Sequence, residues 1–139
     1  MAEKKQKTKQ NIVHVSGKRK RATARVTLKA GKGLVKINNF SLENYKPEVA
    51  KLRIQEPLFL AGEISKKIDI NINVYGGGWN AQADACRTGI GKALSLFQPS
   101  LKKTFLDYDR TLLVSDIRHT EASKPNDSKP RKCRQKSYR

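Results

Sequence analysis

The pattern of hydrophobic and polar residues is most regular between Ile68 and Phe97. Apolar and polar side chains alternate without a break as far as Tyr75, which predicts a strand with one buried and one exposed face. Three glycines follow at residues 76–78, where the chain can take backbone angles that other residues avoid. Apolar residues then recur at steps of three and four, the pattern of a helix with one buried stripe. That predicted stripe is Trp79, Ala83, Cys86, Ile90, Leu94 and Phe97.

The strand and the helix each have one apolar face, so we expect the two to pack together as the core of the domain. Their opposite faces are polar, and we expect these faces to be turned toward a partner. They carry Asn71, Asn73, Arg87 and Lys92.

Shorter alternating stretches predict strands near the N-terminus. Residues 12–15 form a short strand candidate, and residues 24–30 form a half-buried strand. Between them, the basic run at residues 16–21 predicts a loop. Residues 30–33 predict a turn, after which residues 34–37 are expected to return as the hairpin partner of the second strand.

Helical segments are predicted between these strands and the central strand. A short helical turn is expected at residues 41–45, and Pro47 suits the first position of a helix that continues to about Gln55. Pro57 lacks a backbone N–H, so we expect it to end this helix and to begin a second, angled turn. Gly62 is predicted to end that turn.

A last apolar group follows the central helix. Pro99 is expected to open a short helix in which Leu101, Phe105 and Leu106 face inward. Residues 112–114 are apolar and are expected to close the core as a short strand or loop.

The charge of the chain is extreme and unevenly placed. Its 139 residues carry a net charge of +18, and such a field favours association with a polyanion. Residues 1–25 contribute +8 and residues 118–139 contribute +6, so the middle is nearly balanced. We predict a disordered basic extension at 1–11, a folded domain at 12–117 and an extended basic tail at 118–139. The tail contains no Val, Leu, Ile, Met, Phe or Trp and cannot form a core of its own.

Several classes of protein are disfavoured by the composition. There is no run of eighteen apolar residues, and the N-terminus lacks the apolar segment of a secretory signal, so we expect no membrane partner. Cys86 and Cys133 lie far apart and His14 and His119 are isolated, which disfavours a zinc site and favours a reducing compartment. Neither a catalytic set nor a cofactor motif is evident, so we expect neither an enzyme nor a small-molecule substrate.

Two stretches are candidates for binding phosphate. The basic run of Lys18, Arg19, Lys20 and Arg21, together with Arg25, supplies point charges and forked donors for phosphate oxygens. The alternatives are a solvated charge run or a nuclear-address segment. The glycine turn, Gly76, Gly77 and Gly78, precedes a helix whose N-terminal amides attract phosphate. It lacks the spacing of known nucleotide motifs, so an RNA phosphate is favoured over a small-molecule nucleotide.

Two further features leave alternatives open. Gly89 and Gly91 lie within the predicted helix, where each costs about 1 kcal/mol relative to Ala. They indicate either close approach by another backbone, of protein or of nucleic acid, or tight packing of the helix on the sheet. The carboxylates of Asp107, Asp109 and Asp116 are close in sequence, but their basic neighbours favour ion pairs or solvation over a metal site.

Three motifs in order carry a family resemblance. Residues 15–26, with the sequence VSGKRKRATARV, resemble the signature near the start of the small-subunit ribosomal protein S-nine family. The glycine turn with Gln82, Arg87 and the run GIGKAL at residues 89–94 is similar to its central signature. The ending RQKSYR at residues 134–139 is similar to that of the archaeal and eukaryotic branch. The run from 122 to 133 departs from that pattern, with two prolines and no glycine.

The resemblance implies an α+β domain of the ribosomal S5 domain 2-like kind. Such a domain has a four-stranded sheet with helices on one side and a left-handed βαβ crossover, against the usual preference. It also implies a cytoplasmic protein in the head of the small ribosomal subunit. Its expected partners are small-subunit ribosomal RNA, neighbouring head proteins and, through the tail, the peptidyl-site tRNA.

The resemblance and the charge pattern together assign candidate binding residues. Those expected to contact ribosomal RNA are Lys18, Arg19, Lys20, Arg21, Arg25, Gly76, Gly77, Gly78, Arg87, Lys92, Arg118, Lys129, Arg131, Lys132 and Arg134. Those expected nearest the tRNA are Lys136, Ser137, Tyr138 and Arg139. Two other functions stay open: a nucleic-acid-binding or chromatin protein outside the ribosome, and an enzyme that uses the glycine turn for a nucleotide.

Overall fold

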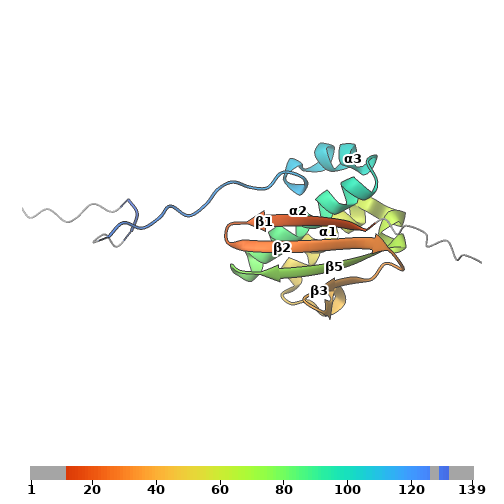
Figure 1. Ribbon diagram of the computed structural model, residues 1–139, viewed down its shortest axis with the longest axis horizontal. Coiled ribbons are helices and arrows are strands. Elements are labelled where there is room, and N and C mark those ends of the chain that lie inside the picture. The colour runs from red at the N-terminus through yellow and green to blue at the C-terminus, as the bar shows by residue number, and fades with distance from the viewer. Residues whose placement is uncertain (1–11, 126–128, 132–139) are drawn as a thin grey trace, which may run out of the picture.

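A five-stranded mixed sheet with helices packed on one face forms the folded part of the chain (Figure 1). The computed structural model describes residues 12–125 and 129–131. The elements in chain order are β1 (Val13–Arg19), β2 (Ala22–Ala30), β3 (Val35–Ile37), β4 (Phe40–Ser41), η1 (Leu42–Asn44), α1 (Glu48–Ala61), η2 (Gly62–Lys67), β5 (Ile68–Tyr75), α2 (Trp79–Phe97), α3 (Leu101–Tyr108) and η3 (Arg110–Leu112).

The strand order is β1-β2-β5-β3-β4, so the central strand of the sequence is also central in the sheet. The mixed α and β architecture with helices on one side confirms the predicted class. The sheet has five strands rather than the predicted four, because the two-residue β4 pairs with β3 through Lys36 and Ile37. The parallel strands β3 and β5 enclose α1 as a βαβ unit. The left-handed sense of that crossover stays a prediction.

The predicted hairpin between residues 24–30 and residues 34–37 is wrong. β3 pairs in parallel with β5, where Val35 lies opposite Ile70. The edge of β2 that a hairpin would need is already occupied, because β2 pairs antiparallel with β5 along its length, from Thr23 opposite Tyr75 to Ala30 opposite Ile68.

The predicted basic loop at residues 16–21 is also wrong in extent. β1 continues to Arg19, and only Lys20 and Arg21 form the turn to β2. The cationic residues tolerate a strand here because Ser16 and Lys18 lie on the exposed face, while Gly17 lies on the buried one.

Helix α1 continues through Pro57 to Ala61, so the predicted break at this proline is wrong. The Pro57 ring is buried, and Ala50 and Ile54 lie on the same buried face. Packing of α1 on the core therefore outweighs the hydrogen bond that Pro57 cannot make. The helix ends at Gly62, as predicted, with a φ of +55° that favours glycine.

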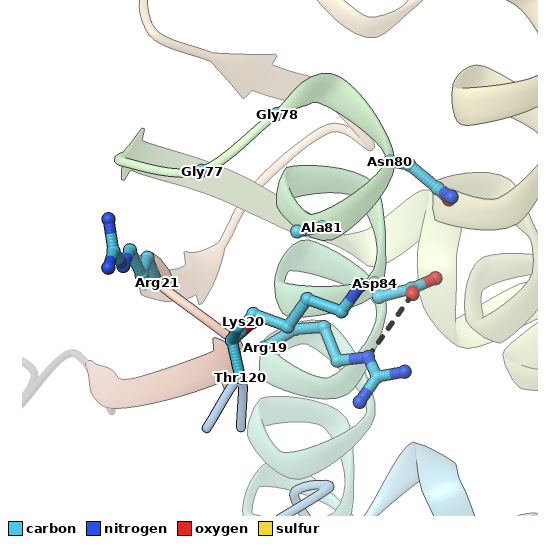
Figure 2. A pocket seen from close by; sticks show the side chains of 9 residues that line it. All are labelled: Arg19, Lys20, Arg21, Gly77, Gly78, Asn80, Ala81, Asp84 and Thr120. Carbon is cyan, nitrogen blue, oxygen red and sulfur yellow. Dashed lines mark ion pairs between the residues drawn. The ribbon is translucent and has the colours of Figure 1, made fainter. Parts of the chain in front are cut away.

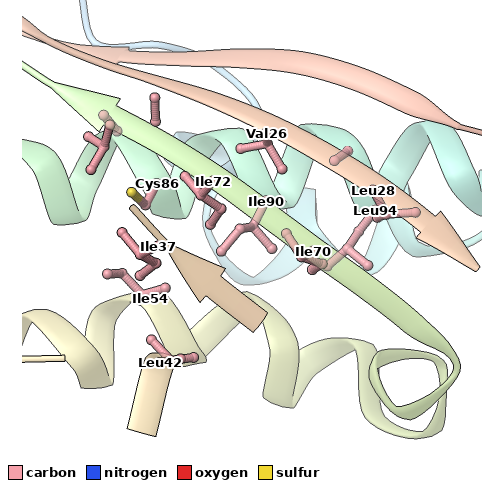
Figure 3. Close-up of a cluster of buried hydrophobic side chains, with 14 of the residues drawn as sticks. Val26, Leu28, Ile37, Leu42, Ile54, Ile70, Ile72, Cys86, Ile90 and Leu94 are labelled. Carbon is pink, nitrogen blue, oxygen red and sulfur yellow. The ribbon is translucent and has the colours of Figure 1, made fainter. Parts of the chain in front are cut away.

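The core lies between the covered face of the sheet and helices α1 and α2 (Figure 3). Its fully buried side chains include Val26, Leu28, Ile37, Ile54, Ile70, Ile72, Cys86, Ile90 and Leu94. The α2 stripe is therefore confirmed for Ala83, Cys86, Ile90 and Leu94. Trp79 is 50% exposed because it begins the helix at the rim of the core, and α3 buries Leu101 and Phe105 but leaves Leu106 exposed.

The helix glycines serve packing within the chain. A Cβ on Gly89 would lie 2.7 Å from Val26 Cγ2, and one on Gly91 would lie 2.6 Å from the carbonyl oxygen of Leu112. Tight packing on the sheet is therefore confirmed for Gly89, whereas Gly91 is closely approached by another backbone, that of η3.

Candidate nucleic-acid interface

The turn between β1 and β2 presents two adjacent cationic side chains. Lys20 and Arg21 are both exposed, and they link Arg19 to Ala22 across the narrow end of the hairpin. Lys20 has a φ of +53°, an angle that is uncommon for a residue with a side chain. Because glycine adopts this angle freely, a lysine at this position costs some stability.

The glycine turn after β5 packs directly on the backbone of that cationic turn. Gly76 and Gly77 have φ values of +76° and +64°, which explains the need for glycine. A Cβ on Gly76 would lie 2.5 Å from the carbonyl oxygen of Arg21, and one on Gly77 would lie 3.2 Å from the amide nitrogen of Ala22. The two turns, far apart in the sequence, therefore form one surface.

The N-terminus of α2 opens onto the same surface. Its N-cap is Gly78, which has no side chain to accept from the first amides, and no acidic residue occupies the first turn. The first N–H groups of a helix lack intrahelical partners and carry partial positive charge. This end of a 19-residue helix therefore favours an anion.

These three features surround a cavity of about 520 Å³ (Figure 2). It is lined by Arg19, Lys20, Arg21, Gly77, Gly78, Asn80, Ala81, Asp84 and Thr120. The one carboxylate in this lining, that of Asp84, is already paired: its oxygens lie 3.1 Å from Arg53 Nη1 and 3.6 Å from Arg19 Nε. Lys20, Arg21 and the helix amides are then the groups left to bind an anion.

Arg19 contributes mainly to the frame of the cavity. Its Nη1 lies 2.5 Å from Asp116 Oδ2, and the same carboxylate accepts from the side chain and the amide of Arg118. These hydrogen bonds from Arg118 hold the pKa of Asp116 well below its usual range. Arg19 therefore fastens the segment after η3 to the sheet, and this segment brings Thr120 to the rim of the cavity.

Arg87 is the centre of an ion-pair network inside the fold. It forms a bidentate pair with Glu56, at 2.5 and 3.0 Å, and its Nη2 donates to Asp109 at 2.7 Å. Burial by itself would lower the pKa of Arg87, but the hydrogen bonds from this guanidinium to Glu56 and Asp109 raise it. Its side chain is only 15% exposed. The guanidinium is thus committed to tying α2 to α1 and η3.

The other predicted cations are spread more widely. Lys18 lines a smaller hollow of about 160 Å³ on the other side of Asp84, together with Arg87 and Arg118. Lys92 donates to Ser115 Oγ at 2.8 Å, and Arg131 pairs with Glu121 at 2.7 Å. Arg25 lies on the open face of the sheet, and Lys129 is exposed.

Some predicted sites lie outside the described residues. They are Lys132, Arg134, Lys136, Ser137, Tyr138 and Arg139, with the extension at 1–11.

Reactive cysteine and metal chemistry find no support in the described part of the chain. Burial raises the pKa of the Cys86 thiol to about 12, so this group stays protonated and unreactive. Within residues 12–125 and 129–131 no three His, Cys, Asp or Glu side chains gather as metal ligands. Asp109 and Asp116 form ion pairs, as predicted. Asp116 pairs with its neighbour Arg118 and also with Arg19, whereas Asp109 pairs with Arg87, which is distant in the sequence. No helix among the described residues is long and apolar enough to cross a membrane.

Sequence reasoning missed four residues of the cavity: Asn80, Ala81, Asp84 and Thr120. The spacing of Asn80 and Asp84 places both on one face of the first turns of α2, where Arg53 contacts them. The spacing of these two residues could therefore have been used to place them on one surface from the sequence. Nothing in the sequence around Thr120 indicated that the chain returns to this surface.

Comparison with known proteins adds an independent line of support. Residues 17–139 match the family described as ribosomal protein S9/S16. The chain is 51% identical over 132 residues to the small ribosomal subunit protein uS9 of Methanococcus maripaludis strain C7, covering 92% of this chain and 98% of the relative. The uS9 protein of Methanococcus vannielii is 50% identical over the same shares of both chains.

Proposed function

The chain belongs to the ribosomal protein S9/S16 family, and on that premise we propose that it binds small-subunit ribosomal RNA through the cavity between the β1–β2 turn and the N-terminus of α2. The family is structural and not enzymatic, and the chain has a structural role in the small ribosomal subunit, in the cytoplasm. Its position in the head of the subunit is part of the proposal.

One observation carries the proposal: two turns from distant parts of the sequence meet so that two cationic residues and a helix N-terminus line one cavity. Lys20 and Arg21 come from one side and the amides after Gly78 from the other. Each of these groups stabilises a phosphate oxygen, and a bound phosphodiester would contact both. Because these contacts go to the backbone of the RNA, they position the domain and carry no base specificity.

The C-terminal tail is proposed to extend this interface. Its predicted cations neutralise further phosphates, and its final residues, 136–139, reach the peptidyl-site tRNA. The support is the resemblance of the ending to that of the archaeal and eukaryotic branch, and a composition that favours ordering on a polyanion. Arg118, Lys129 and Arg131 are all exposed along the described part of this path.

A separate surface is proposed to contact a neighbouring ribosomal protein. A hollow of about 250 Å³ lies between β3, η1 and α1, and Leu34 and Phe59 on its rim are 57% and 73% exposed. Residues 40–67 carry five basic and four acidic residues, so this region lacks the positive field that RNA binding requires. Exposed apolar side chains on a nearly neutral surface favour a protein partner.

Photo-crosslinking in assembled small subunits tests the proposed RNA site. A benzoylphenylalanine at Thr120, which lines the cavity, is expected to crosslink to ribosomal RNA. The same probe at Leu106, an exposed position on α3, serves as the control. If the Thr120 probe captures only protein, or captures RNA no more than the Leu106 probe does, the assignment is wrong.

A further inference from the structure

One face of the sheet is covered by helices, and no element among the described residues covers the other face, which is turned to the viewer in Figure 1. We call it the open sheet face. Its side chains are His14, Ser16 and Lys18 from β1, Thr23, Arg25, Thr27 and Lys29 from β2, Lys36 from β3, and Asp69, Asn71, Asn73 and Tyr75 from β5. None of these residues is buried.

The open sheet face is positively charged. Lys18, Arg25, Lys29 and Lys36 are exposed on it, and Asp69 is its one acidic residue. Asp69 Oδ1 accepts from the backbone amides of Lys32, at 2.8 Å, and Leu34, at 3.1 Å. These two hydrogen bonds lower the pKa of Asp69, and the bond from Leu34 has the larger effect. The carboxylate of Asp69 thereby holds the turn between β2 and β3 in place.

The face also carries an aromatic group with a guanidinium beside it. Arg25 Cζ lies 5.7 Å from the centre of the Tyr75 ring, which is 53% exposed. The register explains the contact: Thr23 lies opposite Tyr75 and Arg25 opposite Asn73, so Arg25 and Tyr75 are diagonal neighbours on one face. Exposed aromatic rings and guanidinium planes are the groups on which unpaired RNA bases stack.

Polar side chains fill the space between these cations. The register aligns Lys36, Asn71, Thr27 and His14 in one row across four strands. Three steps of about 4.8 Å between strands make this row roughly 14 Å long. The hydroxyl of Thr27 is bonded to His14 Nδ1 at 3.1 Å, while the amides of Asn71 and Asn73 are exposed. Exposed amides donate to and accept from ribose hydroxyls and base edges.

From these observations, and resting on the proposed binding of ribosomal RNA, we propose that the open sheet face is a second RNA-binding surface. Lys29 and Lys36 contact phosphates, and the Arg25–Tyr75 pair stacks on an unpaired base. The face is continuous with the turn cavity, because Lys18 and Thr23 lie at the end of β1 and β2 nearest the turn. An RNA segment leaving the cavity would continue across the strands.

A protein partner fits this face less well. Apart from Tyr75, it presents no large apolar side chain, whereas the exposed leucine and phenylalanine side chains of the chain lie elsewhere. Protein interfaces have an apolar core that is depleted of lysine. The four cations, the two amides and the aromatic ring of this face are instead groups that bind the phosphates, riboses and bases of RNA.

The test is the salt-dependent binding of the full chain to small-subunit ribosomal RNA transcribed in vitro. The double variant Lys29→Gln/Lys36→Gln removes two charges from the open sheet face. Its matched control is Lys102→Gln/Lys103→Gln, which removes two exposed charges from α3. We expect the slope of log K against log salt to become less steep by about 2 in the first variant and to change little in the control.

Stacking is tested at Tyr75. Tyr75→Leu is expected to raise Kd about fivefold or more, and Tyr75→Phe is expected to keep the wild-type value because the ring remains. The proposal is overturned if the double variant and its control have the same slope, or if Tyr75→Leu binds like wild type. It is equally overturned if crosslinks from this face in assembled subunits reach only protein.

The cavity provides the reference that separates this proposal from the proposed function. Lys20→Gln/Arg21→Gln is measured in the same titration. A loss in the cavity variant without a loss in the sheet variant overturns only the second surface. If the cavity variant retains its binding, the cavity assignment itself is wrong, whatever the sheet variant does.

Discussion

Gly17 of β1 and Gly89 of α2 pack backbone to backbone. A Cβ on Gly17 would lie 2.7 Å from the amide nitrogen of Gly89 and 2.0 Å from the carbonyl oxygen of Ala85. Because neither position has room for a side chain, β1 lies directly on the helix. This contact fixes the strand that ends in the Lys20–Arg21 turn, so the packing of two glycines determines where the cationic turn stands relative to α2.

We therefore expect Gly17→Ala to destabilise the chain strongly. The new methyl group meets backbone atoms that cannot rotate away, and overpacking of this kind costs about 3 kcal/mol. The measurement is the free energy of unfolding in urea. Ser16→Ala, at the neighbouring exposed position, is the control and is expected to change it by less than about 0.5 kcal/mol. Equal stability of the two variants would show that the close approach is wrong.

Lys20 is expected to show opposite effects on stability and on binding. Lys20→Gly removes the cost of a left-handed backbone angle and is expected to raise the free energy of unfolding by about 0.5–1 kcal/mol. The same change removes a phosphate contact and is expected to weaken binding to ribosomal RNA. Urea unfolding and RNA titration of this variant measure the two effects. If the variant is more stable and binds RNA as well as wild type does, Lys20 is not part of the RNA interface.

The loss of stability at low pH is expected to depend in part on Asp109. Burial alone would raise the pKa of this carboxyl, but hydrogen bonds from Thr111 and Arg87 outweigh it and lower the pKa to about 2, from an ordinary 3.8. Because the folded-state value is the lower one, the stabilisation is complete above pH 3.8 and is lost as the pH falls toward 2.

The corresponding measurement compares variants over pH. The difference in unfolding free energy between wild type and Asp109→Asn is expected to be of the order of 1 kcal/mol near pH 6 and to shrink as the pH falls below 4. Asp107→Asn, which also removes one carboxylate but at an exposed position on α3, is the control variant. A difference that stays constant down to pH 2 would contradict the assignment of the network around Arg87.

Removal of residues 136–139 is expected to separate binding of tRNA from assembly. These residues carry two cations and a tyrosine, and the proposed function places them at the peptidyl-site tRNA. Small subunits that contain the truncated chain should form normally but retain peptidyl-site tRNA less well in a filter-binding measurement. Unchanged retention of tRNA would refute the role proposed for the tail.

The parts of the fold that follow local periodicity could be predicted from the sequence. The alternation in β5 and the apolar stripe in α2 gave the bounds of both elements, because each has one face in the core. The pairing of β3 could not be predicted in this way, since a parallel partner lies across a whole helix in the sequence. The continuation of α1 through Pro57 also depends on tertiary packing.

The candidate site shows the same division. The charge of Lys20 and Arg21 and the glycines at 76–78 were visible in the sequence as separate features. Their contact, in which the backbone of Gly76 lies against the carbonyl of Arg21, depends on the order of the strands. Likewise, Arg87 looked like a free cation on a polar face, but Glu56 and Asp109, which are 31 and 22 residues away in sequence, engage it.

The salt dependence of RNA binding tests most directly whether Lys20 and Arg21 at the cavity contact phosphates. The full chain is titrated with small-subunit ribosomal RNA from about 0.1 to about 0.4 M salt, as wild type, as Lys20→Gln/Arg21→Gln and as Lys102→Gln/Lys103→Gln. If Lys20 and Arg21 bind phosphates, the slope of log K against log salt becomes less steep by about 2 in the cavity variant alone. Equal slopes for the cavity variant and the α3 variant would show that Lys20 and Arg21 do not bind phosphates.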